Sequence, residues 1–243
     1  MKSPLIEVHD LHYRYSDGTL ALDGVDFVLY AGETVALLGA NGSGKTTFVL
    51  HLNGILAGEG SVMVCGMPVG KDTVAAVRQK IGLVFQESDN QLFMPSVLED
   101  VAFGPLNLGM DRTHAENRAR LALEQVGLEA AAHKAPYHLS AGEKKRAAIA
   151  GILAMEPEIL VLDEPTTFLD PPGRRALIDL LAGLPQSKIL VTHDIEFAAA
   201  LADRAVFFDR GKVAGEGPTG EIIRRFGWDK SNHRSAASCS REG

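Results

Sequence analysis

The sequence predicts an α/β fold built on a mixed, largely parallel sheet, with a smaller antiparallel sheet before it and an inserted helical region. Short, continuously apolar runs recur along the chain with helical stretches between them, which is typical of parallel strands buried on both faces. Near the start, apolar and polar side chains alternate instead, as they do in half-buried antiparallel strands. From about residue 96 to 155, helical periodicity replaces the strand signals.

The predicted strands fall into two kinds. Alternation over 5–8 and 25–29 predicts antiparallel strands, whereas the run 34–38 predicts the first strand buried on both faces. Further strands of the buried kind are expected at 81–85, 159–162, 189–191 and 205–208.

The domain organisation follows from this pattern. At 243 residues with 46% hydrophobic side chains, the chain can bury a sizeable core, and we expect one large domain over 1–227. Its helical subdomain is predicted at about 96–155 and includes a helix over 116–126, where Gly127 stands at a helix-ending position. The last segment, 228–243, is almost free of apolar residues and is predicted to be a disordered polar tail.

Composition and charge exclude several classes of function. A formal net charge of -7 argues against nucleic acid as a partner, because nucleic-acid-binding surfaces cluster Lys and Arg. No apolar run reaches the roughly 18 residues that a membrane-spanning helix needs, and the polar start MKSPLIEVHD does not resemble a signal peptide. Cys65 and Cys239 fit neither a disulfide framework nor a zinc spacing, so we expect a cytosolic chain with incidental cysteines.

A G-x-x-x-x-G-K-T motif follows the buried strand 34–38 and opens a predicted helix over 45–53, which Gly54 ends. Its glycines allow successive backbone N–H groups to point at phosphate oxygens, and the helix N-terminus adds partial positive charge. Lys45 is expected to reach the β- and γ-phosphates, and the Thr46 hydroxyl to bind Mg²⁺. The alternative is a glycine-rich turn without a ligand. The predicted ATP-binding residues here are Gly39, Ala40, Asn41, Gly42, Ser43, Gly44, Lys45, Thr46 and Thr47.

Two further strands end in polar residues that suit nucleotide hydrolysis. Asp163 and Glu164 follow 159–162, where an open parallel sheet places its ligands, so Asp163 can hold Mg²⁺ and Glu164 can polarise a water. His193 follows 189–191 on the same edge and is a candidate for orienting that water or sensing the γ-phosphate. A solvated strand exit and an ordinary surface histidine are the alternatives.

A second anion-binding helix start is predicted at Ser140. Ser140 and Glu143 have the spacing of a capping box, which predicts a helix over 141–154. Together with the phosphate loop, Asp163, Glu164 and His193, the segment 139–142 (LSAG) resembles the nucleotide-binding subunit of ATP-binding cassette (ABC) proteins. The resemblance extends from residue 5 to about residue 226.

This resemblance implies a head-to-tail dimer in which Ser140 and Gly142 of one copy contact the γ-phosphate held by the other. It also implies that Tyr15 stacks on adenine, with Tyr13 as a competing candidate. By the same likeness Gln86 touches Mg²⁺ and the attacking water, and Asp170 couples the two sites.

The loop before Asp170 departs from the family pattern. Phe168 stands where many relatives carry a smaller residue, which leaves the coupling detail open. Because Glu164, His193 and Ser140 are all present, a homodimer would contain two complete sites.

The segment 84–95, VFQESDNQLFMP, places Leu92, Phe93 and Met94 in a connection between predicted elements. An apolar cluster with a polar rim is typical of a protein-contact surface, although packing on the helical subdomain is the alternative. The stretch 85–93, continued by 99–105 (EDVAFGP), resembles the ATPases of energy-coupling factor importers, with the cobalt/nickel branch as the closest likeness. That resemblance implies a subunit on the cytoplasmic face of the membrane, bound near Gln91 to a transmembrane scaffold that acts on a substrate-binding membrane protein.

Other functions remain open at this stage. A vitamin such as biotin is the alternative cargo, and a soluble ABC ATPase acting on DNA or ribosomes, or a nucleotide switch with negligible turnover, are the alternative roles. The histidine pairs His9/His12 and His133/His138 stand without the Cys or carboxylate partners of a metal site, so the cargo assignment depends on the family likeness.

Overall fold

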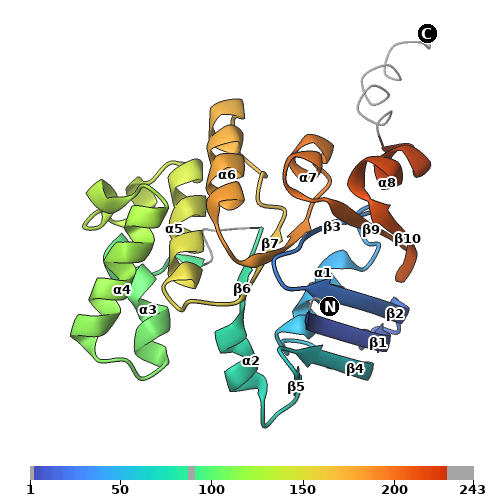
Figure 1. Cartoon of the computed structure of the whole chain (residues 1–243). Coiled ribbons are helices and arrows are strands. Elements are labelled where there is room, and N and C mark those ends of the chain that lie inside the picture. Colours follow the sequence, from blue (N-terminus) through green and yellow to red (C-terminus); the bar gives the residue numbers. More distant parts are fainter. Residues whose placement is uncertain (1–2, 87–90, 229–243) are drawn as a thin grey trace.

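Two sheets form the framework of the chain in the computed structural model, which describes residues 3–86 and 91–228 (Figure 1). The smaller sheet is antiparallel, and its order is β2-β1-β4-β5. The larger sheet has the order β10-β9-β3-β8-β7-β6 and is parallel except for β10. The strands are β1 (Pro4–Arg14), β2 (Leu20–Tyr30), β3 (Thr34–Leu38), β4 (Glu59–Val64), β5 (Met67–Pro68), β6 (Ile81–Val84), β7 (Ile159–Asp163), β8 (Ser187–Val191), β9 (Arg204–Asp209) and β10 (Lys212–Pro218).

The helices cover both faces of the larger sheet. They are α1 (Lys45–Leu52), α2 (Val74–Lys80), α3 (Val97–Asn107), α4 (Arg112–Gln125), α5 (Ala141–Leu153), α6 (Pro171–Gly183), α7 (Ile195–Leu201) and α8 (Thr219–Arg225), with short 3-10 turns η2 (Glu129–Ala131) and η3 (Pro136–His138). Helix α1 packs between the two sheets through Phe48 and Leu52, whereas α6, α7 and α8 pack on the opposite face of the larger sheet. This arrangement confirms the predicted α/β fold with an antiparallel sheet at its start.

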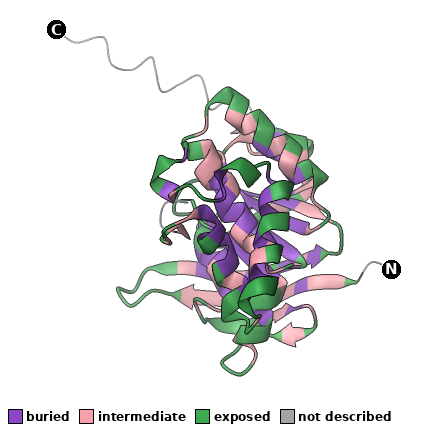
Figure 2. Ribbon diagram, turned by 90° about the vertical axis from the view of Figure 1, so that its left-hand side faces the viewer, coloured by how far each residue is buried: buried purple, intermediate pink, exposed green. Residues whose placement is uncertain are grey.

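Strand β3 shows why the continuous apolar runs belong to the larger sheet. Val35 and Leu37 point into the core shared with α1 and the smaller sheet, while Ala36 and Leu38 point into the core under α7 and α8. Successive side chains of a strand alternate between faces, so only a strand covered on both sides needs every residue to be apolar. Figure 2 shows the buried residues gathered on the inner strands and on the inward sides of the helices.

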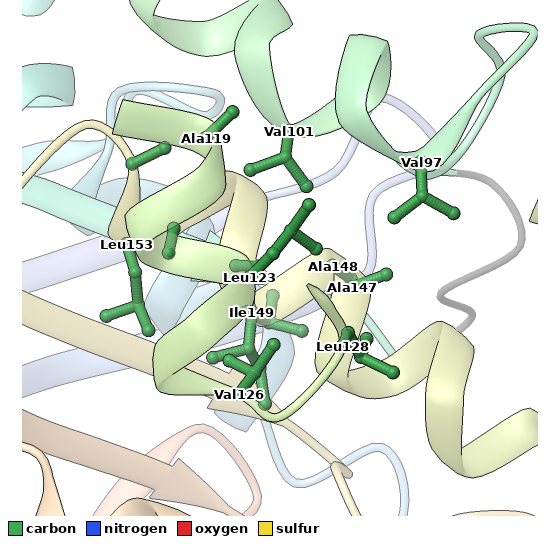
Figure 3. Packing of buried hydrophobic residues seen from close by; sticks show 14 of the residues in the cluster. Val97, Val101, Ala119, Leu123, Val126, Leu128, Ala147, Ala148, Ile149 and Leu153 are labelled. Atoms are coloured by element: carbon green, nitrogen blue, oxygen red, sulfur yellow. The ribbon is translucent and has the colours of Figure 1, made fainter. Parts of the chain in front are cut away.

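Helices α3, α4 and α5 lie together at the end of the molecule opposite the smaller sheet (Figure 1). Their apolar sides meet in one cluster in which Val101, Leu123 and Ile149 are fully buried (Figure 3). Helix α4 begins before the predicted 116–126 because Asp111 caps it, its carboxylate accepting a hydrogen bond from the backbone N–H of His114. The first turn of α4 is polar, so the periodicity of apolar residues does not reveal where the helix begins.

Trp228 differs from its predicted place in a polar tail. Its ring contacts Phe207 of β9 edge-to-face, with the ring centres 5.6 Å apart. The remainder of the predicted tail lies outside the described residues. In residues 3–86 and 91–228, no helix has both the length and the apolar character that crossing a membrane requires.

Arg204 of β9 binds Glu33, in the turn that precedes β3. Its guanidinium donates to both carboxylate oxygens of Glu33, at 2.7 and 3.1 Å, and to the carbonyl of Val28 at 2.6 Å. Both side chains are mostly buried, so removal of Arg204 takes the guanidinium partner away from a buried carboxylate. We expect Arg204→Met to lower the free energy of unfolding by about 3 kcal/mol in urea titrations.

The matched control is Arg112→Met, because Arg112 forms an i,i+4 pair with Glu116 on an exposed helix face. That change should cost less than about 0.5 kcal/mol. Equal effects of the two substitutions would contradict a structural role for the Arg204 cluster.

Candidate active site

The phosphate loop joins β3 to α1 at the carboxyl edge of the larger sheet. Gly44, the residue before α1, has φ 107°, and a Cβ there would lie 2.6 Å from the carbonyl oxygen of Ala21. Only glycine fits both constraints. The Lys45 ammonium is buried and donates to the carbonyls of Gly39 and Ala40, at 2.7 and 2.9 Å. Burial lowers the pKa of Lys45, and the carboxylates of Glu164 and Asp163 act in the opposite direction.

Asp163 ends β7 beside the loop. Its Oδ2 accepts a hydrogen bond of 3.0 Å from the Thr46 hydroxyl, which joins the phosphate loop to this strand. Its Oδ1 is buried and has no hydrogen-bond partner among the described residues, and burial raises the pKa of this carboxyl group. A hydroxyl and a carboxylate oxygen left without a donor are the ligands that Mg²⁺ takes in nucleotide sites. Thr46 and Asp163 therefore fit the predicted Mg²⁺ site.

Glu164 and His193 meet across the ends of two neighbouring strands. Glu164 has a positive φ of 44°, and its backbone N–H donates to the carbonyl of Val191 at the end of β8, 2.8 Å away. Its Oε2 lies 2.8 Å from Nδ1 of His193. Because a carboxylate only accepts hydrogen bonds, Nδ1 carries the proton. The Glu164 side chain is 11% exposed and that of His193 64%, so the histidine lies on the solvent side of the carboxylate.

A cavity of about 490 Å³ collects most of the predicted site residues. Tyr15, Gln86, Asp163, Glu164 and His193 line it together with the phosphate loop and the start of α1. Three residues that the sequence did not single out also contribute to the wall, at the end of the β1–β2 turn and the start of β2. They are Thr19, Leu20 and Ala21.

The two candidate tyrosines differ in position. The Tyr15 hydroxyl lies 2.9 Å from the Thr47 hydroxyl at the mouth of the cavity. Tyr13 lies behind it, edge-to-face with both Tyr15 and His51, and packs on the core between the two sheets. The geometry therefore favours Tyr15 over Tyr13 as the aromatic that faces a base.

Gln86 enters the cavity from the end of β6, and a buried lysine holds its backbone. The Lys145 ammonium, on α5, donates to the carbonyl of Gln86 at 2.7 Å. Sequence reasoning missed Lys145, although it interrupts the apolar face of a helix whose buried neighbours are Ala148 and Ile149. A charged residue on such a face is the signal that could have found it.

The connection after Gln86 is only partly described, because residues 87–90 lie outside the described part. Gln91 was expected near a membrane partner, but its side chain turns inward: it accepts from the Phe85 N–H at 2.9 Å and donates to the Leu83 carbonyl at 3.2 Å. Leu92 packs on the helical core, whereas the alternative interpretation concerned Phe93 and Met94. Phe93 behaves differently, since it is 62% exposed.

Asp100 fixes the exposed part of this connection. Its Oδ1 accepts hydrogen bonds from the backbone N–H groups of Phe93 and Met94, both at 3.0 Å. The Phe93 ring meets Phe103 of α3 edge-to-face, with centres 5.0 Å apart. Phe93 of the connection and Phe103 of α3 thus form a pair of exposed aromatic rings beside a hydrogen-bonded backbone.

Ser140 and Gly142 line a different cavity, of about 540 Å³, together with Phe168 and Asp170. Ser140 caps α5 in the predicted capping box, accepting from the Glu143 N–H while the Glu143 carboxylate accepts from the Ser140 N–H. None of the described residues lines both this cavity and the cavity of about 490 Å³ beside the phosphate loop, which we call the phosphate cavity. Within one chain, the two groups of predicted ATP ligands are therefore apart.

Comparison with known proteins agrees with this geometry. Residues 22–167 match the family of ABC transporters, so the chain belongs to that family and is an ABC-type ATPase. It is 47% identical over 225 residues to the energy-coupling factor transporter ATP-binding protein EcfA of Methanocaldococcus jannaschii, covering 90% of this chain and 81% of the relative.

Two solved structures extend the comparison. One is cbiO1 from Clostridium perfringens, described as part of the ABC transporter complex cbiONQ, with a TM-score of 0.84, 38% identity and coverage of 93% of this chain and 92% of that chain. The other is the dimeric ATP-binding cassette MJ0796 in a post-hydrolysis state with ADP and Pi, with a TM-score of 0.79, 29% identity and coverage of 88% and 98%. The resemblance to ABC ATPases drawn from the motifs is confirmed.

Proposed function

We propose that this chain hydrolyses ATP as one half of a head-to-tail dimer and thereby energises an energy-coupling factor importer. The observation that carries the proposal is the separation of the phosphate cavity from the cavity of Ser140 and Gly142. A Cβ at Gly142 would meet only Leu169 among the described atoms, at an ordinary 3.8 Å, so packing within the chain does not require glycine there. A close approach by ATP bound to a second copy would require it.

The chemistry assigned to the phosphate cavity uses its own residues. Backbone N–H groups of the loop and of the first turn of α1 bind the phosphates, and Lys45 turns from the loop carbonyls to the β- and γ-oxygens. Thr46 and Asp163 hold Mg²⁺, which offsets the negative charge on the phosphate oxygens when bound. Gln86, whose backbone Lys145 holds, would contact Mg²⁺ and the attacking water.

Glu164 acts as the general base. Its carboxylate takes a proton from the attacking water, and the His193 Nδ1–H fixes the direction of that carboxylate. Tyr15 packs against the adenine. On the other side of the dimer, the Ser140 hydroxyl and the N–H groups at the start of α5 contact the γ-phosphate. Asp170 caps α6, accepting from the Gly173 N–H at 2.9 Å, and belongs to the loop that couples the two sites.

The membrane partner is assigned to the exposed rings of Phe93 and Phe103. A transmembrane scaffold that binds there would follow the movement of Gln86, because Gln86 and Phe93 belong to the same connection between β6 and α3 and Phe103 contacts Phe93. The chain would then be peripheral, on the cytoplasmic face of the membrane. The cargo proposed is cobalt or nickel ion, on the likeness of the motif segment to that branch of importers and the similarity to EcfA and cbiO1.

The docking assignment predicts the behaviour of Phe93→Ala combined with Met94→Ala. This protein should lose co-sedimentation with membranes and ATP-dependent uptake, while its ATPase rate in solution changes less than about twofold because neither side chain lines the phosphate cavity. Leu121→Ala is the matched control, since Leu121 is 58% exposed on α4 and far from Phe93 in sequence. Retention of both membrane association and uptake would contradict the docking assignment.

The function itself is tested by uptake of labelled Co²⁺ and Ni²⁺ in cells that lack this chain, complemented by the parent or by Glu164→Gln. Restoration by the parent alone is expected and would establish both role and cargo class. If neither metal enters the cells while the protein sediments with membranes, the metal assignment is wrong and a vitamin such as biotin becomes the proposed cargo. If the protein does not associate with membranes at all, the importer role fails and a non-transport ATPase takes its place.

A further inference from the structure

Phe168 combines two unfavourable features. It lies in the loop between β7 and α6 with φ 66°, in the left-handed region, and its side chain is 80% exposed. A bulky residue with positive φ is a conformational outlier, and glycine would occupy the position without strain. The loop holds this shape through backbone hydrogen bonds from Thr167 N–H to the Glu164 carbonyl and from Leu169 N–H to the Thr166 carbonyl, each 3.2 Å.

The side chain contributes little to packing within the chain, because Phe168 is largely exposed to solvent. Neither the backbone nor the core therefore accounts for phenylalanine at this position. Strain of this kind persists where the surrounding structure fixes it, and it concentrates at sites of binding and switching.

The position of Phe168 indicates which molecule would cover its ring. Phe168 lines the same cavity as Ser140, Gly142 and Asp170, whose assigned roles need a second copy of the chain. In a two-fold dimer each copy contributes the same surface, so every dimer would bury two such rings. Exposed aromatic side chains near the centre of an interface carry a large share of binding energy.

We propose that Phe168 is an aromatic anchor of the ATP-bound dimer, covered by the second copy of this chain and held outward at a cost in monomer stability. The inference rests on the proposed dimeric function and adds to it a residue that strengthens association between identical chains.

The test uses Glu164→Gln protein, in which slow hydrolysis keeps ATP between the copies. Phe168→Trp reports burial by fluorescence, and the single native tryptophan, Trp228, packs against Phe207 and supplies a constant background. Phe168→Ala removes the ring but keeps the left-handed strain, whereas Phe168→Gly removes both. Dimer affinity is measured by sedimentation velocity with ATP and Mg²⁺, and melting temperature without nucleotide, with Leu121→Ala as the control.

Emission of the Phe168→Trp protein should shift to the blue when ATP and Mg²⁺ are added. Phe168→Ala and Phe168→Gly should each weaken the dimer by about tenfold or more. Only Phe168→Gly should raise the melting temperature of the monomer, by about 2–4 °C.

Two negative results have different meanings. If the Glu164→Gln protein does not dimerise with ATP, the proposed function fails and the inference with it. A different result would be that the Glu164→Gln protein dimerises, Phe168→Ala and Phe168→Gly do not weaken the dimer, and Phe168→Trp shows no fluorescence shift. Phe168 would then not be an anchor, and the proposed dimeric function would stand. An unchanged melting temperature for Phe168→Gly would refute the stability cost.

Discussion

Glu164→Gln is expected to lower the rate of ATP hydrolysis by about 10²–10³-fold while ATP remains bound. Glutamine keeps the shape of the side chain and can still accept from the His193 Nδ1–H, which lies 2.8 Å from Oε2 in the parent. It cannot take a proton from water at neutral pH. The measurement is steady-state phosphate release together with equilibrium binding of ATP, so that loss of chemistry is distinguished from loss of binding.

Glu196→Gln is the matched control for this prediction. Glu196 lies on α7, close in sequence to His193, and its side chain is 87% exposed and paired with Arg174. Its ATPase rate should stay within about twofold of the parent, because exposed ion pairs contribute little. Parent-like hydrolysis by Glu164→Gln would remove Glu164 from the role of general base and leave Gln86 or His193 to be tested in its place.

The parts of the fold that could be predicted from sequence are those set by local patterns. The run 34–38 had to be a strand covered on both faces, and it is the central β3. Asp163, Glu164 and His193 could be grouped because the carboxyl ends of neighbouring parallel strands meet at one edge of a sheet, and β7 lies beside β8.

The parts that could not be predicted depend on contacts distant in sequence. Strand β4 has an exposed, polar first half and gains its place by pairing with β1 and β5, while β10 is rich in glycine and pairs with β9. The Gln91 side chain turns inward because its amide bonds to the end of β6. The Lys145 ammonium reaches the Gln86 carbonyl because α5 approaches the same strand end. Neither arrangement has a signature in the residues that immediately surround it.

Tyr13 and Tyr15 illustrate the same limit at the end of one strand. Tyr13 lies in β1, and Tyr15 directly follows the last residue of that strand, Arg14. Which of them borders the cavity depends on how far α1 extends under them, and His51 of α1 covers Tyr13 while Thr47 meets Tyr15. Local spacing alone leaves both residues as candidates.

Asp163→Asn is expected to reduce Mg²⁺-dependent ATP hydrolysis by about 100-fold or more, because an amide replaces the one carboxylate assigned to the metal. The same substitution should stabilise the protein in the absence of nucleotide. Oδ1 of Asp163 is buried without a partner among the described residues, and burial raises the pKa of the group above its ordinary value. A raised pKa in the fold means that ionisation is less favourable there than in the unfolded chain.

The sign of the stability effect follows from that shift. The contribution of Asp163 to the free energy of unfolding is most favourable below its ordinary pKa and is lost as pH rises through the raised value in the fold. At pH 7 without Mg²⁺ the ionised side chain therefore destabilises the parent, and asparagine removes the charge. We expect Asp163→Asn to raise the free energy of unfolding by about 1 kcal/mol at pH 7.

With ATP and Mg²⁺ added, the parent should become more stable than Asp163→Asn. The parent gains stability in proportion to the logarithm of ligand concentration over the dissociation constant, while Asp163→Asn gains less because its affinity for the metal complex is lower. Thermal unfolding with and without Mg²⁺, at fixed ATP, measures both effects in one series. A variant that is less stable without nucleotide, or that gains as much from Mg²⁺ as the parent, would show that the buried carboxylate serves the fold rather than the metal.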